Sequence, residues 1–240
     1  MNFQLQWLSP VQCFVVFDLP LATQYEVLLL RYWIGLLQNE WKDQLLEIQL
    51  EPRGILLFFS VKMAKKTTEK RLEKTWQKTI GQKEMRFQSW VFPLLWDHSD
   101  RGDLFQYFKG DPSQLQAYQE QFVAQPLYAA FYGFMPGFVY MGGLPPAMRL
   151  ARKDEPRLQV PAGSVAVGER YVGIYPQVSP GGWQLIGQTP IALFDRNRSP
   201  AFFLAPGDRI LWKSVSASEM KYWQQQYNNL PQSSDDAILL

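Results

Sequence analysis

Glycine and proline are concentrated in three stretches of the later half of this 240-residue chain. The stretches are GFMPGFVYMGGL at Gly133–Leu144, VPAGSVAVG at Val160–Gly168 and GIYPQVSPGGWQLIGQTP at Gly173–Pro190. Glycine permits positive φ or a close backbone approach and proline fixes φ, so the pattern predicts loops of defined shape. A flexible linker would be polar and rich in serine, whereas these turns alternate with aromatic side chains. The stretches therefore predict a folded surface with built-in turns.

The composition, 47% hydrophobic and 19% charged residues, is typical of a globular protein. The net charge of +2 gives no electrostatic reason to expect nucleic acid as a partner. A single cysteine, Cys13, excludes an internal disulfide and a zinc-binding thiolate cluster, and it fits a cytoplasmic setting. No apolar run reaches the roughly 20 residues of a membrane span, and the N-terminus lacks the pattern of a signal peptide. We expect a soluble, cytoplasmic protein with no metal on this chain.

The first third of the chain alternates strand and helix patterns. The predicted elements are a strand at 14–17, a helix that begins at the capping box of Thr23 and Glu26, strands at 45–50 and 55–61, a helix at 67–80 and a strand at 84–92. This order is the split βαβ pattern. It predicts a ferredoxin-like α/β domain over residues 1–92.

Short strands separated by turns dominate the remainder. They are predicted at 127–132, 163–167, 171–175, 183–186, 191–194, 201–204 and 209–212. Two further helices have start signals, at Asp111-Pro112 and at the capping box of Ser216 and Glu219. The pattern predicts a β-barrel or sandwich domain over residues 93–228 and a flexible tail over 229–240. The fold class is therefore α+β.

Two segments resemble known functional motifs but lack features that those motifs require. Gly182–Thr189 has the glycine spacing of a phosphate-binding loop, but Gln188 replaces the lysine and Pro190 stands where a helix would begin. The run Asp97-His98-Ser99-Asp100 offers the residue types of a catalytic triad, whose members must converge from separate elements. We interpret that run as a polar loop.

Two other features could bind an anion. Backbone N–H groups of Ser179–Gly182 can form an anion-binding nest, although a tight turn between strands explains the same residues. Arg152 and Arg157 bracket a charged loop and could make bidentate contacts to a carboxylate or phosphate, although solvated arginines are the simpler alternative.

The three stretches, together with PGDRILW at Pro206–Trp212, resemble the family that contains the B subunits of 5-oxoprolinase, the kinase inhibitor KipI and allophanate hydrolase subunit 1. The resemblance implies a cyclophilin-like β-barrel after the α/β domain. It implies two partners, a related barrel-fold protein like the C subunit of 5-oxoprolinase and a third protein like its A subunit. It also implies that the complex uses ATP to open the lactam of 5-oxoproline, giving glutamate; whether ATP binds this chain stays open. KipI-like members instead bind and inhibit a histidine kinase.

The sequence departs from the family pattern at several positions. Residues 122–132 lack the histidine that family members carry before the first stretch, Ala151 precedes Arg152 in place of proline, Val172 replaces threonine and Gln188 replaces arginine. Loss of a histidine and an arginine weakens the expected ability to transfer protons and hold anions. An inactive or altered-specificity relative stays open as an alternative.

The expected site is a cleft formed by the three stretches. Its predicted substrate- or anion-binding residues are Arg152, Arg157, Ser164, Tyr175, Gly181, Gly182, Gln188 and Thr189. Its predicted walls are Phe134, Pro136, Gly137, Phe138 and Trp183. The sequence assigns no catalytic residue. Two functions follow: one component of a 5-oxoprolinase-like amidohydrolase complex, or a non-catalytic KipI-like protein that docks on a kinase. In the second case aromatic side chains such as Phe134, Phe138 and Trp183 are interface anchors, although a place in the barrel core explains each of them equally well.

Overall fold

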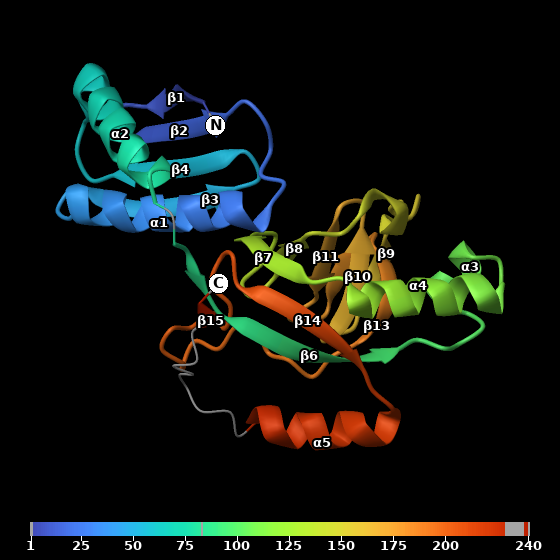
Figure 1. Ribbon diagram of the computed structural model, residues 1–240. Helices are drawn as coiled ribbons and strands as arrows, with labels where there is room; N and C mark the ends of the chain where they lie inside the picture. Colours follow the sequence, from blue (N-terminus) through green and yellow to red (C-terminus); the bar gives the residue numbers. More distant parts are fainter. Residues whose placement is uncertain (1, 83, 229–237, 240) are drawn as a thin grey trace. The chain divides into compact units, whose positions relative to one another are not determined.

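The computed structural model describes residues 2–82, 84–228 and 238–239, and the fold is mixed α+β (Figure 1). The chain forms two compact units, residues 1–87 with 239–240 and residues 88–238. The first is a sheet covered by helices, and the second contains a closed barrel. Residue 92, where the sequence places the boundary, lies inside a barrel strand.

The first unit is built on a four-stranded antiparallel sheet with the order β1-β2-β4-β3. The strands are β1 (Phe3–Ser9), β2 (Gln12–Phe17), β3 (Leu45–Glu51) and β4 (Gly54–Phe59), and the helices are α1 (Gln24–Glu40) and α2 (Lys65–Ile80). The predicted capping box of Thr23 and Glu26 is confirmed. Both helices cover one face of the sheet, because the Phe17 ring lies 6.3 Å from Trp33 of α1 and 5.2 Å from Trp76 of α2.

The prediction that residues 84–92 complete this sheet is wrong. That segment divides into β5 (Arg86–Phe87), outside the four-stranded sheet, and β6 (Ser89–Trp96), which is a barrel strand. The edge beside β2 is instead occupied by β1, which forms a hairpin with β2. The nearly continuous apolar run of β6 suits a barrel core, where Phe92 and Leu94 are fully buried. The strand order expected of a ferredoxin-like domain is therefore not observed.

The second unit contains a closed seven-stranded barrel with the order β10-β11-β8-β7-β14-β6-β13. Its strands are β6, β7 (Leu127–Tyr132), β8 (Val139–Gly142), β10 (Ser164–Gly168), β11 (Tyr171–Ile174), β13 (Gln184–Gln188) and β14 (Arg209–Ser214). Strands β6 and β14 pair in parallel, with Arg209 opposite Ser89, and they run side by side in Figure 1. Alternate apolar residues of the strands fill the interior, among them Val165, Val167 and Ile210.

Two predicted strands of this region are not formed. Residues 191–194 and 201–204 make an irregular loop, with one isolated bridge between Phe194 and Phe202. The Arg198 guanidinium lies in this loop and donates hydrogen bonds to the carbonyls of Leu193 at 3.3 Å, Pro200 at 3.2 Å and Ala201 at 3.1 Å. The carbonyls of Leu193 and Ala201 also accept the backbone N–H groups of Phe203 at 2.8 Å and Asp195 at 2.9 Å. The Arg198 side chain therefore supplements a few cross-loop backbone bonds that do not extend into a strand ladder.

The remaining elements of the second unit surround the barrel. They are α3 (Asp103–Tyr107), α4 (Pro112–Ala124), a 3-10 helix (Pro146–Met148), the paired strands β9 (Arg157–Val160) and β12 (Ser179–Gly181), and α5 (Ala217–Asn228). The predicted helix starts are confirmed: Asp111 caps α4, and Ser216 and Glu219 form the box before α5.

The two-residue strand β15 (Ile238–Leu239) is the last described element. Most of the predicted tail at 229–240 lies outside the described residues. No helix in the described part of the chain is long and apolar enough to cross a membrane.

Candidate functional site

The second unit has a pocket of about 350 Å³ on the side of the barrel that carries β9 and β12. Its lining residues come from the segments 134–140, 152–156 and 175–183, so the first and third glycine- and proline-rich stretches both contribute. They are Phe134, Phe138, Tyr140, Arg152, Lys153, Pro156, Tyr175, Pro180, Gly181, Gly182 and Trp183.

Aromatic rings form the floor of the pocket. The Phe138 ring contacts Tyr140 at 5.0 Å, Tyr175 at 5.3 Å and Trp183 at 5.5 Å between ring centroids, in edge-to-face geometry. Phe138, Tyr175 and Trp183 are buried. A Cβ at Gly173 would lie 2.6 Å from the Phe138 ring, so only glycine lets this ring pack on the backbone. The glycines of the motif thus make room for the aromatic floor.

Two cations stand at the rim. The Arg152 side chain is 57% exposed, and its Nε lies 3.6 Å from Glu169 Oε1. The backbone N–H of Lys153 donates to the Gly182 carbonyl at 2.8 Å, which fixes the rim segment against the turn after β12. An exposed ion pair of this length exchanges easily for another partner. Arg152 is therefore available to an anionic ligand.

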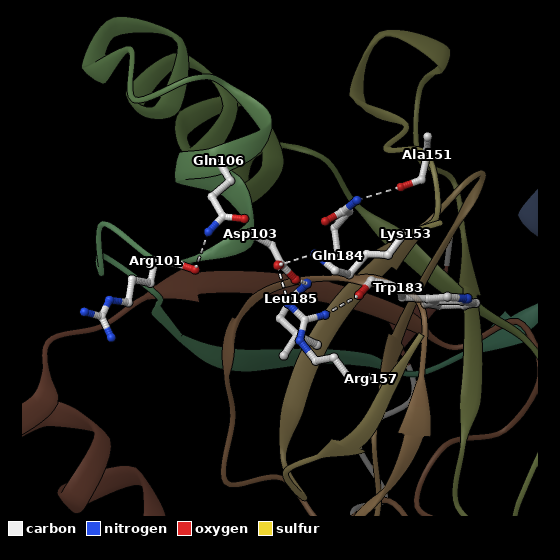
Figure 2. Close-up of polar contacts among 9 residues, drawn as sticks. All are labelled: Arg101, Asp103, Gln106, Ala151, Lys153, Arg157, Trp183, Gln184 and Leu185. Carbon is white, nitrogen blue, oxygen red and sulfur yellow. Dashed lines mark hydrogen bonds and ion pairs between the residues drawn. The ribbon is translucent and has the colours of Figure 1, made fainter. Parts of the chain in front are cut away.

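A buried carboxylate supports the rim from within the unit (Figure 2). The Asp103 side chain, at the start of α3, is 1% exposed. Its Oδ1 accepts from Lys153 Nζ at 3.2 Å and from the Arg157 guanidinium, and its Oδ2 accepts from the Leu185 N–H at 2.7 Å. Arg157 also donates to the Trp183 carbonyl at 3.5 Å. The carboxylate thus joins α3, β9 and β13 beneath the pocket.

The described lining residues offer the pocket no general base. The ionisable ones among them are Tyr140, Arg152, Lys153 and Tyr175. Burial raises the pKa of Tyr140, with the charge of Arg152 as a smaller opposing influence. Burial also raises the pKa of Tyr175, and a hydrogen bond to the Trp183 backbone opposes the rise. Both phenols are neutral at physiological pH, so the pocket is suited to binding and not to proton abstraction.

Several predicted site residues meet in this pocket. Of the predicted anion-binding residues, Arg152, Tyr175, Gly181 and Gly182 line it, and of the predicted walls, Phe134, Phe138 and Trp183 do so. Arg157 lies behind the lining, where Asp103 occupies its guanidinium.

The other predicted residues lie elsewhere. Gln188 is exposed at the far end of β13, opposite Ser164 of β10, and Ser164 and Thr189 are buried there. Pro136 is exposed and Gly137 is buried, and neither belongs to the lining. The substitution of the usual arginine at position 188 therefore does not remove a lining side chain.

The structure adds Lys153, Tyr140 and Asp103 to the site. Lys153 follows Arg152 directly, and Tyr140 lies in the first stretch. Both residues could therefore have been predicted as site residues from their positions in the sequence. Asp103 lies 50 residues before Lys153 and 54 residues before Arg157, the two cations that it binds. In the sequence it looks like an acidic residue at an ordinary helix start. Only the folded barrel brings it to them.

The rejected catalytic motifs are explained by their structures. Gly182–Thr189 is mostly β13, an extended strand that leads into irregular chain where a phosphate-binding loop would lead into a helix. His98 is exposed in a loop, where Asp97 accepts the N–H of Ser99 at 3.0 Å. Across the described part of the chain, no three His, Cys, Asp or Glu side chains gather as a metal-binding group.

Comparison with known proteins shows the family of the chain. Residues 15–204 match the family model of the carboxyltransferase domain, subdomains C and D. The 5-oxoprolinase B subunit of Haemophilus influenzae is 32% identical over 182 residues, which cover 74% of this chain and 83% of that protein. The chain belongs to the family of 5-oxoprolinase B subunits, which confirms the resemblance seen in the motifs.

Other relatives match over shorter parts. The 5-oxoprolinase B subunit of Escherichia coli O157:H7 is 52% identical over 80 residues, 33% of this chain and 37% of that protein. The solved structure of TTHA0988 is 26% identical with a TM-score of 0.68, and the match covers 86% of this chain and 40% of that one. Kluyveromyces lactis urea carboxylase, at 16% identity and a TM-score of 0.71, shares the fold over 99% of this chain and 24% of its own length.

Proposed function

We propose that this chain is one component of a 5-oxoprolinase-like, ATP-dependent amidohydrolase complex, and that its pocket binds 5-oxoproline. The relatives named as 5-oxoprolinase B subunits support the role within a complex. One observation carries the assignment of the pocket: an aromatic floor, cations at the rim and no carboxylate or general base among the described lining residues. We also propose that the barrel is of the cyclophilin-like type, in keeping with its closed seven-stranded form.

The chemistry of the ligand fits the pocket. 5-Oxoproline carries a carboxylate on a small, nearly flat lactam ring. The guanidinium of Arg152 can donate two parallel hydrogen bonds to the carboxylate. Lys153 also lines the pocket, with its Nζ paired to Asp103 Oδ1 at 3.2 Å. The faces of Tyr140 and Trp183 give the ring an apolar surface. Backbone N–H groups near Gly181 and Gly182 are candidates to hold the lactam oxygen.

The residues that line the pocket indicate which steps of the reaction this chain performs and which its partners perform. Opening a lactam requires activation of the ring carbonyl and proton transfers to the leaving nitrogen. Neutral phenols with raised pKa values do not abstract protons at physiological pH. The groups that act on ATP and transfer protons are therefore assigned to two partners, a barrel-fold protein like the C subunit of 5-oxoprolinase and a third protein like its A subunit. This chain binds and orients the substrate.

The test is reconstitution. Co-expression with the two partner proteins should give ATP hydrolysis that depends on added 5-oxoproline, and none when this chain is omitted. An assembled, folded complex with no 5-oxoproline-dependent turnover would refute the proposal.

Exposed apolar side chains favour a second candidate, a non-catalytic KipI-like regulator that binds a histidine kinase. Leu158 of β9 is 87% exposed, and Val178, which directly precedes β12, the strand paired with β9, is 60% exposed. Exposed apolar side chains mark an interaction surface where they form a contiguous patch. Purification from native extract distinguishes the two: recovery of a sensor kinase supports regulation, and recovery of a barrel-fold partner supports the enzyme complex.

A further inference from the structure

Phe134 has a backbone conformation that bulky residues rarely adopt. Its φ is 68°, in the left-handed region that glycine enters freely and asparagine tolerates. Its side chain is 61% exposed, so burial recovers little of the conformational cost. A strained and exposed aromatic residue contributes poorly to folding stability. Strain of this kind is found where a side chain serves a ligand.

The loop around Phe134 holds the ring in place. The N–H of Met135 donates to the Gly133 carbonyl at 2.7 Å, and the N–H of Phe138 donates to the Met135 carbonyl at 3.0 Å. The Phe134 ring meets Phe138 edge to face, with centroids 5.4 Å apart and an interplanar angle of 85°. Phe138 belongs to the pocket floor. Phe134 therefore extends the aromatic surface of the floor to the exposed part of the lining.

This arrangement suits a flat ring better than an open chain. A ring offers a face that packs on an aromatic wall, and it has few rotamers to lose on binding. An open-chain acid can reach Arg152 equally well, but it must be ordered to contact Phe134. The discrimination between the two therefore depends on the aromatic wall and not on the cations.

We propose that Phe134 determines specificity in this pocket, by closing its ring over small cyclic carboxylic acids and selecting them over open-chain acids. The proposal rests on the proposed function of the pocket as a carboxylate site. It assigns to Phe134 a contact with the ligand and no role in proton transfer.

The test compares Phe134→Asn with wild-type chain by calorimetric titration of three probes: 5-oxoproline, benzoate and the open-chain N-acetylglycine. Asparagine accepts positive φ, so the thermal midpoint should stay within about 2 °C of wild type. The two cyclic acids should bind about 2- to 10-fold more weakly, as expected for one lost aromatic contact, and N-acetylglycine should change little. Phe134→Tyr keeps the ring and should retain the selectivity.

Lys109→Asn is the matched control, because Lys109 also has a positive φ, 51°, and lies outside the pocket lining. It should leave all three affinities unchanged. If benzoate binds and 5-oxoproline does not, and if Phe134→Asn weakens the binding of benzoate, the role of Phe134 is supported and the proposed substrate is refuted. Binding of 5-oxoproline that is unaffected by Phe134→Asn would overturn the inference and leave the proposed function intact. Binding of none of the probes would overturn the inference, and reconstituted turnover would still decide the proposed function.

Discussion

Replacing Asp103 with asparagine should destabilise the barrel unit and disorder the pocket rim. The side chain is 1% exposed and accepts from three donors, on Lys153, Arg157 and Leu185. Asparagine has nearly the same shape, so the change removes charge and leaves two cations facing an amide. The perturbation therefore isolates the electrostatic contribution of the carboxylate.

The loss of stability caused by Asp103→Asn depends on how deeply the charged side chains are buried. Removing one partner of a fully buried ion pair costs about 3–5 kcal/mol, because the other charge is left unpaired. Here the side chains of Lys153 and Arg157 are 27% and 28% exposed and can partly regain water, so the cost is reduced to about 2–3 kcal/mol. For a unit of this size the thermal midpoint should fall by about 4–12 °C.

The assay is thermal unfolding followed by near-ultraviolet circular dichroism, which reports the aromatic packing of the pocket floor. Asp111→Asn is the control, because Asp111 is only partly buried and asparagine also caps helices, so it should leave the midpoint nearly unchanged. A double mutant with Arg157→Gln should lose less than the sum of the single losses. A decrease below about 1 °C for Asp103→Asn, or full additivity in the double mutant, would refute the reasoning, since a paired buried charge must couple to its partner.

Three further predictions concern the core. Gly173→Ala should destabilise the barrel unit by about 1–3 kcal/mol in chemical denaturation, because the new Cβ would lie 2.6 Å from the Phe138 ring; a neutral effect would show that the aromatic floor is loosely packed. Burial raises the pKa of the Cys13 thiol to about 12, so roughly one molecule in 10,000 carries the thiolate at pH 8, and iodoacetamide should label Cys13 at the rate of unfolding and no faster. Burial raises the pKa of Tyr118 and of Tyr132 above the usual 10, so the folded state retains protons that the unfolded state releases, and the free energy of unfolding should fall as pH rises above 10; a thermal midpoint that is unchanged between pH 9 and 11 would contradict this.

Local signals in the sequence predicted local structure well. The capping boxes at Thr23 and Ser216 and the Asp111-Pro112 start are each satisfied within four residues, so chain order alone determines them. The β1 strand was missed, although FQLQWLS alternates apolar and polar residues from Phe3 to Trp7. Its exposed alternate positions are typical of an edge strand, and the signal was available.

Long-range pairing was beyond what the sequence could determine. The apolar run of β6 is compatible with either unit, and its parallel pairing with β14 joins residues about 120 positions apart. The sequence could name several of the lining residues because they lie within the first and third stretches, whereas the second stretch, which the expected cleft included, contributes none of the described lining residues. The pocket's supporting carboxylate, Asp103, was not predicted, since no spacing rule links a helix start to two distant cations.

The proposed function gives this chain a binding pocket, and not the catalytic groups, of a 5-oxoprolinase-like complex. The most direct measurement is the steady-state kinetics of the reconstituted complex with Arg152→Gln in this chain. Arg149→Gln is the control, because Arg149 is exposed and outside the lining. Loss of a charge-assisted contact used in binding should raise the KM for 5-oxoproline by about tenfold or more and leave kcat within about twofold of wild type. A loss of kcat at unchanged KM, or no change in either constant, would contradict the account.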